Sequence, residues 1–149
     1  MKAAAPIPSN FILLSYRYKA VLLKAFAQNG FSLQIMHYEV LKCITHSIDE
    51  CTATSICSLL HRDKGQIARI IKLLTREKLI TKKTVKDDSR STTLHLTKKG
   101  VKQYQDLQTI ENGVIDALNL GLNSSDLEQF NQIIEQMNQN LTWNYFNDR

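Results

Sequence analysis

The sequence predicts a mainly α-helical protein that carries one small β-hairpin. Proline and glycine are scarce, at 2 and 5 of 149 residues, which disfavours an all-β fold with many tight turns. Apolar residues recur at helical spacing through most of the chain. One stretch, residues 80–97, instead combines β-branched residues with a two-residue alternation. The length and the 43% of hydrophobic residues suffice for one domain with its own core.

The first 31 residues are predicted to form an arm and a dimerisation helix. Residues 1–9 contain both prolines and are expected to be disordered or extended. The helix that follows, from Asn10 to about Gln28, is apolar on several faces, so more than one neighbour must bury it. In a chain this short, we expect one of these neighbours to be a second subunit.

Three helices are predicted next. Ser32 is the expected cap of a helix whose core stripe covers residues 33–44, and a polar break follows over residues 45–52. A short helix is expected at residues 54–60. After a tight turn, a stronger helix is expected at residues 64–77, where Asp63 and Gln66 have the spacing of a capping box.

The helix at residues 64–77 has two distinct faces. Four apolar residues at helical spacing predict the buried face: Ile67, Ile70, Ile71 and Leu74. The opposite face carries Gly65, Arg69, Lys72 and Arg76, with Gln66 at its side. Two short amphipathic helices joined by a tight turn, the second with a basic outer face, predict a helix-turn-helix.

Two short strands, at residues 80–86 and 91–97, are predicted around a polar turn at residues 87–90. Leu94 is expected on one face of the second strand and Thr93 on the other. A hairpin directly after a helix-turn-helix is a wing. The predicted fold is therefore a winged helix-turn-helix, at residues 32–97, flanked by long helices that dimerise.

Residues 98–149 are predicted to form two C-terminal dimerisation helices. Thr97 is the expected cap of a helix that ends near Leu120, and Ser125 with Glu128 predicts the start of the last helix. The last helix has coiled-coil-like 3-4 spacing, so the chain is expected to be one intertwined homodimeric domain. The predicted interface residues are Phe11, Leu14, Phe130, Ile134, Met137 and Leu141.

Charge is concentrated in the predicted reading head. Residues 60–102 contain 13 Lys and Arg against 4 Asp and Glu, a formal charge of +9, whereas the remaining 6 basic and 10 acidic residues give −4. A basic block inside a fold is typical of nucleic-acid binding. The alternative on charge alone is a solvated basic face.

The string RDKGQIARIIKLLTREKLI, followed by DDSRSTTLHLTKKG, resembles the MarR family of regulators. The wing signature of that family is matched by Asp88, Arg90, Leu96, Thr97 and Gly100. The resemblance covers nearly the whole chain. It implies an obligate homodimer, a recognition helix in the major groove, a wing-tip arginine in the minor groove, and regulation by a small molecule or an oxidant.

The chain departs from the family pattern at three positions. Lys78 stands where glycine is common, and a positive φ there would cost about 1 kcal/mol. Thr75 replaces a frequent glutamate, so a structural ion pair is in doubt. Ser89 replaces a frequent second wing arginine, which puts a phosphate contact in doubt.

The candidate DNA contacts divide into base readers and backbone contacts. Gln66 and Arg69 have the chemistry to read adenine and guanine, whereas Lys72 and Arg76 are better placed for phosphates. Arg90 is expected to probe the minor groove, with a salt bridge to Asp88 as the alternative. The full predicted set is Lys64, Gly65, Gln66, Arg69, Lys72, Arg76, Lys82, Lys83, Asp88 and Arg90.

Tyr16, His37 and Tyr38 are candidates for an effector pocket, with ordinary packing as the alternative. The three cysteines, Cys43, Cys51 and Cys57, form no C-x-x-C pair, and the first helix has none. His46, Cys51, Cys57 and His61 match no compact zinc pattern, so neither a metal nor a cofactor is expected.

The predicted function is a sequence-specific regulator of transcription that binds a pseudo-palindromic operator in duplex DNA. We expect a repressor that a small-molecule effector relieves. The alternatives are a winged-helix protein-interaction module without DNA binding and a redox-sensing regulator that uses a cysteine. No catalytic motif is present, which predicts a protein that is not an enzyme. No signal peptide or membrane segment is recognised, so a cytoplasmic protein is expected.

Overall fold

The computed structural model describes residues 7–85 and 88–146, and the side chains of residues 9–84 and 92–141. The chain divides into two compact units, residues 1–114 and residues 115–149. Within the described ranges, no helix is long and apolar enough to cross a lipid bilayer. The elements follow in the order α1 (Ile7–Gln28), α2 (Ile35–His46), α3 (Ala53–Leu60), α4 (Lys64–Arg76), β1 (Ile80–Val85), β2 (Asp88–Leu96), α5 (Lys98–Leu118) and α6 (Ser124–Phe146).

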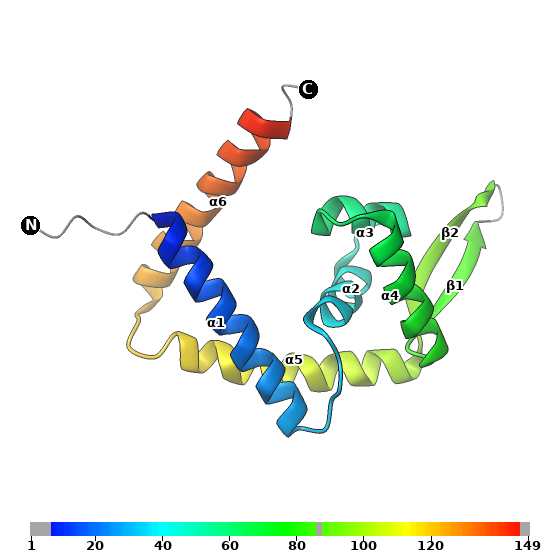
Figure 1. The fold of residues 1–149 in the computed structure, drawn as a ribbon, viewed down its shortest axis with the longest axis horizontal. Coiled ribbons are helices and arrows are strands. Elements are labelled where there is room, and N and C mark those ends of the chain that lie inside the picture. The colour runs from blue at the N-terminus through cyan, green and yellow to red at the C-terminus, as the bar shows by residue number, and fades with distance from the viewer. Residues whose placement is uncertain (1–6, 86–87, 147–149) are drawn as a thin grey trace, which may run out of the picture. The chain divides into compact units, whose positions relative to one another are not determined.

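The predicted class, mainly α with a two-stranded antiparallel hairpin, is confirmed (Figure 1). The core of the first unit lies where α2 packs against α4 and β2. The predicted apolar stripe of α4 is buried, and α3 packs on the same helix. From α1, Phe26 meets the Tyr38 ring edge-to-face, with 5.2 Å between ring centroids. Burial of these large side chains provides most of the driving force for folding.

Several predicted element ends were wrong. Residues 7–9, expected in the arm, already belong to α1. Gln34, not Ser32, is the cap of α2, because Ser32 lies too far ahead of the first turn. Asn123, not Ser125, caps α6. The side chain of Asn123 accepts from the Asp126 N–H at 2.9 Å, and the Asp126 carboxylate accepts from the Asn123 N–H at 3.1 Å.

A very short segment, Cys51 and Thr52, pairs with β2 of the hairpin, which the sequence did not reveal. The Leu94 N–H donates to the Cys51 carbonyl at 2.8 Å, and Thr52 forms a bridge to Thr93. Cys51 and Thr93 are therefore buried, although the sequence placed Cys51 in a polar break and Thr93 on the outer face. β2 begins at Asp88, earlier than predicted, after a shift in register next to Thr84.

One junction joins the end of α4, both ends of the hairpin and the start of α5. Lys78 takes a left-handed φ of 59° there, in line with its place at a position where glycine is common. The Thr97 hydroxyl donates to the Lys78 carbonyl at 2.6 Å, and the Thr97 N–H donates to the Leu79 carbonyl at 3.0 Å. The same hydroxyl caps α5 by accepting from the Gly100 N–H at 3.0 Å. Gly100 packs directly on the Leu79 carbonyl, where a Cβ would clash with the oxygen.

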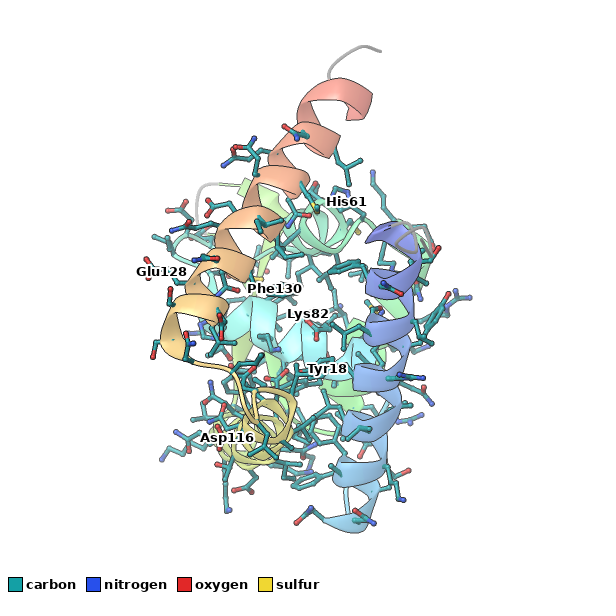
Figure 2. All side chains as sticks on the ribbon, turned by 90° about the vertical axis from the view of Figure 1, so that its left-hand side faces the viewer. Tyr18, His61, Lys82, Asp116, Glu128 and Phe130 are labelled. Carbon is teal, nitrogen blue, oxygen red and sulfur yellow. The ribbon has the colours of Figure 1, made fainter. Side chains whose placement is uncertain are left out.

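A buried carboxylate joins α1, α2 and α5. Glu111 is only 7% exposed and accepts from the hydroxyls of Tyr18 and Tyr38, both at 2.7 Å, and from Lys42 Nζ at 3.0 Å. Figure 2 shows Tyr18 on α1. Burial alone would raise the pKa of Glu111, but the three hydrogen bonds and the charge of Lys42 outweigh it and lower that pKa. Burial, followed by the hydrogen bond to Glu111, raises the pKa of both tyrosines.

Gly100→Ala is expected to destabilise the fold by about 2–3 kcal/mol, because the new methyl group must displace the Leu79 backbone. Gly113→Ala in the same helix is the matched control, because its Cβ would meet nothing within 4 Å. That variant should gain about 0.5–1 kcal/mol from helix propensity. Thermal unfolding of the three proteins checks the opposite signs. Equal melting temperatures for both variants would show that the junction is not tightly packed.

Glu111→Gln is expected to lower stability at pH 7 by about 1–3 kcal/mol, because an amide cannot accept all three hydrogen bonds. A lowered folded pKa contributes stability that is present above the ordinary value of 4.5 and is lost as the pH falls through the folded pKa. The difference between wild type and variant should therefore shrink in acid. Urea unfolding at pH 7 and at lower pH measures it, with the exposed Glu128→Gln as control. A pH-independent difference would contradict the charged network.

Candidate nucleic-acid interface

α4 is held by its apolar face and presents its polar face to solvent. Its start is fixed by Asp63, whose carboxylate accepts from the Gln66 N–H at 2.8 Å. This is the first half of the predicted capping box. The four core residues of α4 are buried, whereas Arg69 and Lys72 are exposed. The rotation of α4 about its axis is therefore set by the core, which fixes the direction of its basic side chains.

The outer face of α4 is hollowed into a basic groove of about 440 Å³, lined by Arg69, Lys72, Leu73 and Arg76. No acidic residue occurs within α4. Arg76 forms a long, exposed ion pair with Glu77 at 3.5 Å, which contributes little stability. Within the described part of the chain, no ion pair neutralises Arg69 or Lys72. These cations remain available for an external anion.

Small residues occupy the beginning of the same face. Gly65 and Ala68 are both exposed and lie one turn ahead of Arg69 and Lys72. Without long side chains at these positions, the helix can approach a surface closely at its N-terminal end. The arrangement suits a helix end that enters a groove, with cations behind it to contact the walls.

The hairpin extends the basic surface. Lys82 and Lys83 of β1 are exposed, and they pair in register with Leu94 and Thr93 of β2. Asp88 lies at the start of β2 and Arg90 within it, but the side chains of both lie outside the described residues. Their predicted roles at the wing tip stay predictions, as does that of Ser89.

The three predicted effector residues differ in how deeply they are buried. Tyr38 is fully buried and donates to Glu111, which makes it a core residue. Tyr16 is 67% exposed. His37 is half-buried, and burial lowers its pKa. The predicted role of these three residues in an effector pocket stays a prediction.

A cleft that the sequence did not reveal lies between α2, the end of α4 and the start of α5. It has a volume of about 340 Å³, which is within the range of small-molecule sites. Its polar lining includes His37, Arg76, Lys99 and Gln103. Its apolar lining consists of Leu33, Leu41, Leu73, Leu74 and Leu79. Only tertiary packing brings these segments together, so sequence spacing carries no signal for them.

The three cysteines form no disulfide among the described residues. Cys43 and Cys51 are buried and Cys57 is half-buried, and all three are free. Burial raises the pKa of the Cys43 thiol to about 11, so that thiol stays protonated at neutral pH. In the described ranges, the predicted loose set of His46, Cys51, Cys57 and His61 is not gathered into a metal-binding cluster.

The predicted dimer residues lie on exposed or half-exposed positions of α1 and α6. Phe11 is 47% and Phe130 48% exposed, and Leu14 and Leu141 are exposed as well. Figure 2 labels Phe130 on α6. Ile134 and Met137 are half-buried. Large apolar side chains at this exposure are unusual for a monomer when they gather on one element, as they do on α1.

Residues 33–100 match the family model described as winged helix DNA-binding domain. This match covers α2, α3, α4 and the hairpin, and so includes the helix that carries the basic groove. A search of curated protein sequences gives no significant match.

Solved structures share the fold over nearly the whole chain. MepR of S. aureus in complex with DNA matches with a TM-score of 0.80 and 21% identity, over 93% of this chain and 100% of that chain. A MarR/EmrR family transcriptional regulator from Acinetobacter sp. ADP1 matches with a TM-score of 0.80 and 16% identity, over 91% and 94%. Wild-type MarR of E. coli, in its apo form, gives 0.75 and 13%, over 91% and 98%. The resemblance to the MarR family is confirmed at the level of the fold.

Proposed function

We propose that this protein is a transcriptional regulator that binds duplex DNA sequence-specifically as a homodimer. The observation that carries the proposal is the basic groove on α4, which contains Arg69, Lys72 and Arg76 and no acidic residue. It lies on a winged helix domain, and a protein of the same fold was solved in complex with DNA. Exposed cations on a rigid helix suit the phosphates and base edges of a major groove.

In this proposal, α4 enters the major groove with Gly65 and Ala68 leading. Arg69 follows one turn behind and reads a base, with guanine as its preferred partner. Lys72 and Arg76 contact the phosphates, and the hairpin lysines contact the adjacent backbone. Arg90 reaches the minor groove from the wing. The site acts by binding and carries out no reaction.

Dimerisation follows from the apolar surfaces of α1 and α6. Phe11, Leu14 and Phe130 lose solvent contact only if another surface covers them. A second copy of the chain is the proposed cover, because a two-fold pair of reading heads requires one. We further propose a cytoplasmic repressor whose DNA binding is relieved by a small molecule.

Two mutant classes separate reading from positioning. Arg69→Ala should cost about 1–3 kcal/mol against a selected operator and relax the preference at one base position. Lys72→Ala should weaken binding to all duplexes and lower the salt slope by about one. Arg17→Ala, which removes an exposed arginine of α1 outside the basic block, is the control. Salt titrations of operator and random DNA measure all three.

The outcome also decides between the proposed function and its alternatives. If Arg69→Ala weakens operator and random DNA equally, Arg69 is a phosphate contact. If the wild-type chain binds no duplex even at low salt, the protein-interaction alternative is correct. If binding is lost only after oxidation and a cysteine variant prevents that loss, the redox alternative is correct.

Phe130→Asp is expected to dissociate the dimer or cause aggregation, because a carboxylate cannot be buried in an apolar interface without a partner. Asn131→Asp adds the same charge at a neighbouring exposed position and should leave the dimer intact. Sedimentation velocity at micromolar concentration distinguishes the two species. A compact folded monomer of the wild-type chain at that concentration would contradict dimerisation.

A further inference from the structure

The start of α4 carries one acidic side chain at the leading end of an otherwise basic face. Asp63 is the N-cap residue of α4, and it is exposed. Its chain neighbours Arg62 and Lys64 are exposed cations, and within the described residues no ion pair joins either of them to Asp63. The two cations outnumber the carboxylate, so this end of α4 can still approach a phosphate backbone.

Capping of α4 occupies one of the two carboxylate oxygens of Asp63. Its Oδ1 accepts from the Gln66 N–H at 2.8 Å. An ionised carboxylate has acceptor sites for about four hydrogen bonds, so the cap leaves acceptor capacity on Oδ2. Asp63 can therefore hold the first turn of α4 and accept from an external donor at the same time.

Gly65 leaves this carboxylate open on the exposed face of α4. A Cβ added at Gly65 would lie 3.2 Å from Asp63 Oδ1. The carboxylate therefore lies close to Gly65, on the face that also carries Arg69 and Lys72. A side chain at position 65 would crowd the carboxylate, whereas glycine leaves room for a partner in front of it.

A carboxylate in a major groove discriminates among bases because it has no donor. Guanine presents two acceptors there, and thymine presents an acceptor with a methyl group, so both disfavour a carboxylate. Adenine combines its N6 donor with the N7 acceptor. Cytosine presents its N4 amino group as a donor without such an acceptor, which makes cytosine the preferred partner of an aspartate.

We propose that Asp63 is a specificity-determining residue that reads the N4 amino group of a cytosine in each operator half-site while it caps α4. The assignment rests on the proposed DNA-binding function and adds a second base reader to Arg69. Asp63 and Arg69 are six residues apart, about 9 Å along a helix, and base pairs are stacked about 3.4 Å apart. The cytosine should therefore lie about two to four base pairs from the base that Arg69 reads.

The test begins with duplexes that the full-length wild-type protein selects from a random pool. Replacement of the preferred cytosine by thymine, together with its partner base, should lower affinity about tenfold, because an acceptor takes the place of a donor. Half-sites without a preferred cytosine at this distance would overturn the assignment to Asp63 and leave the proposed function intact. Enrichment of no duplex would refute the proposed function, and the assignment with it.

Two substitutions of Asp63 keep the cap and change the reader. Asparagine and serine cap helices about as well as aspartate, so both variants should melt close to wild type. The amide of Asp63→Asn can present an acceptor or a donor, so the preference for cytosine over thymine should fall from about tenfold to less than about threefold. Asp63→Ser, whose side chain is shorter, should relax the preference equally. A folded variant of either kind that keeps the tenfold preference would show that Asp63 only caps α4.

Glu77→Gln is the matched control, because Glu77 is the acidic residue that caps the opposite end of the same helix. Asp63→Asn and Glu77→Gln each remove one negative charge from an end of α4. Both should therefore strengthen binding to random duplexes, most clearly at low salt. Only Asp63→Asn should change the preference between cytosine and thymine. Equal loss of that preference in the two variants would show a general charge effect and overturn the reading role of Asp63.

Discussion

The contact between Gly100 and the Leu79 carbonyl is the constraint on which the rest of the winged helix domain depends. It allows α5 to start directly against the chain that leaves α4. Thr97 then closes the junction through the carbonyls of Lys78 and Leu79 and caps α5 at the same time. Helix α4, the hairpin and α5 therefore cannot shift independently. The junction requires Lys78 to adopt a left-handed backbone conformation, which is strained for a residue other than glycine.

A second set of contacts, centred on Glu111, holds α1 against α2 and α5. Glu111 receives hydrogen bonds from α1 and from α2 in a buried site. Its charge is stabilised by donors rather than by solvent, so the network is specific in geometry and costly to disrupt. The apolar N-terminal half of α1, ahead of Tyr18, is left exposed, and this is where a second subunit is proposed. The contact of α1 with Glu111 and the proposed dimer interface thus occupy different parts of one helix.

The sequence predicted the elements well where local periodicity decides them. The isoleucine stripe of α4 and its opposite basic face follow from spacing alone, and Thr97 was correctly expected to cap α5. Prediction from the sequence failed where contacts between distant segments decide which residues are buried or line a cleft. Cys51 is buried by a bridge to the hairpin, and the cleft beside Lys99 is assembled from three separate segments. The caps at Gln34 and Asn123 were missed because neighbouring serines match the same local pattern.

The central claim is that two copies of α4 read one face of a duplex. Selection of bound duplexes from a random pool by the full-length protein, followed by sequencing and footprinting, tests it most directly. The account predicts a pseudo-palindrome whose half-sites lie about one helical turn, roughly 10 base pairs, apart. Arg69→Ala should blur one symmetric pair of positions in the selected motif. Enrichment of a single asymmetric half-site, or no enrichment at all, would contradict the account.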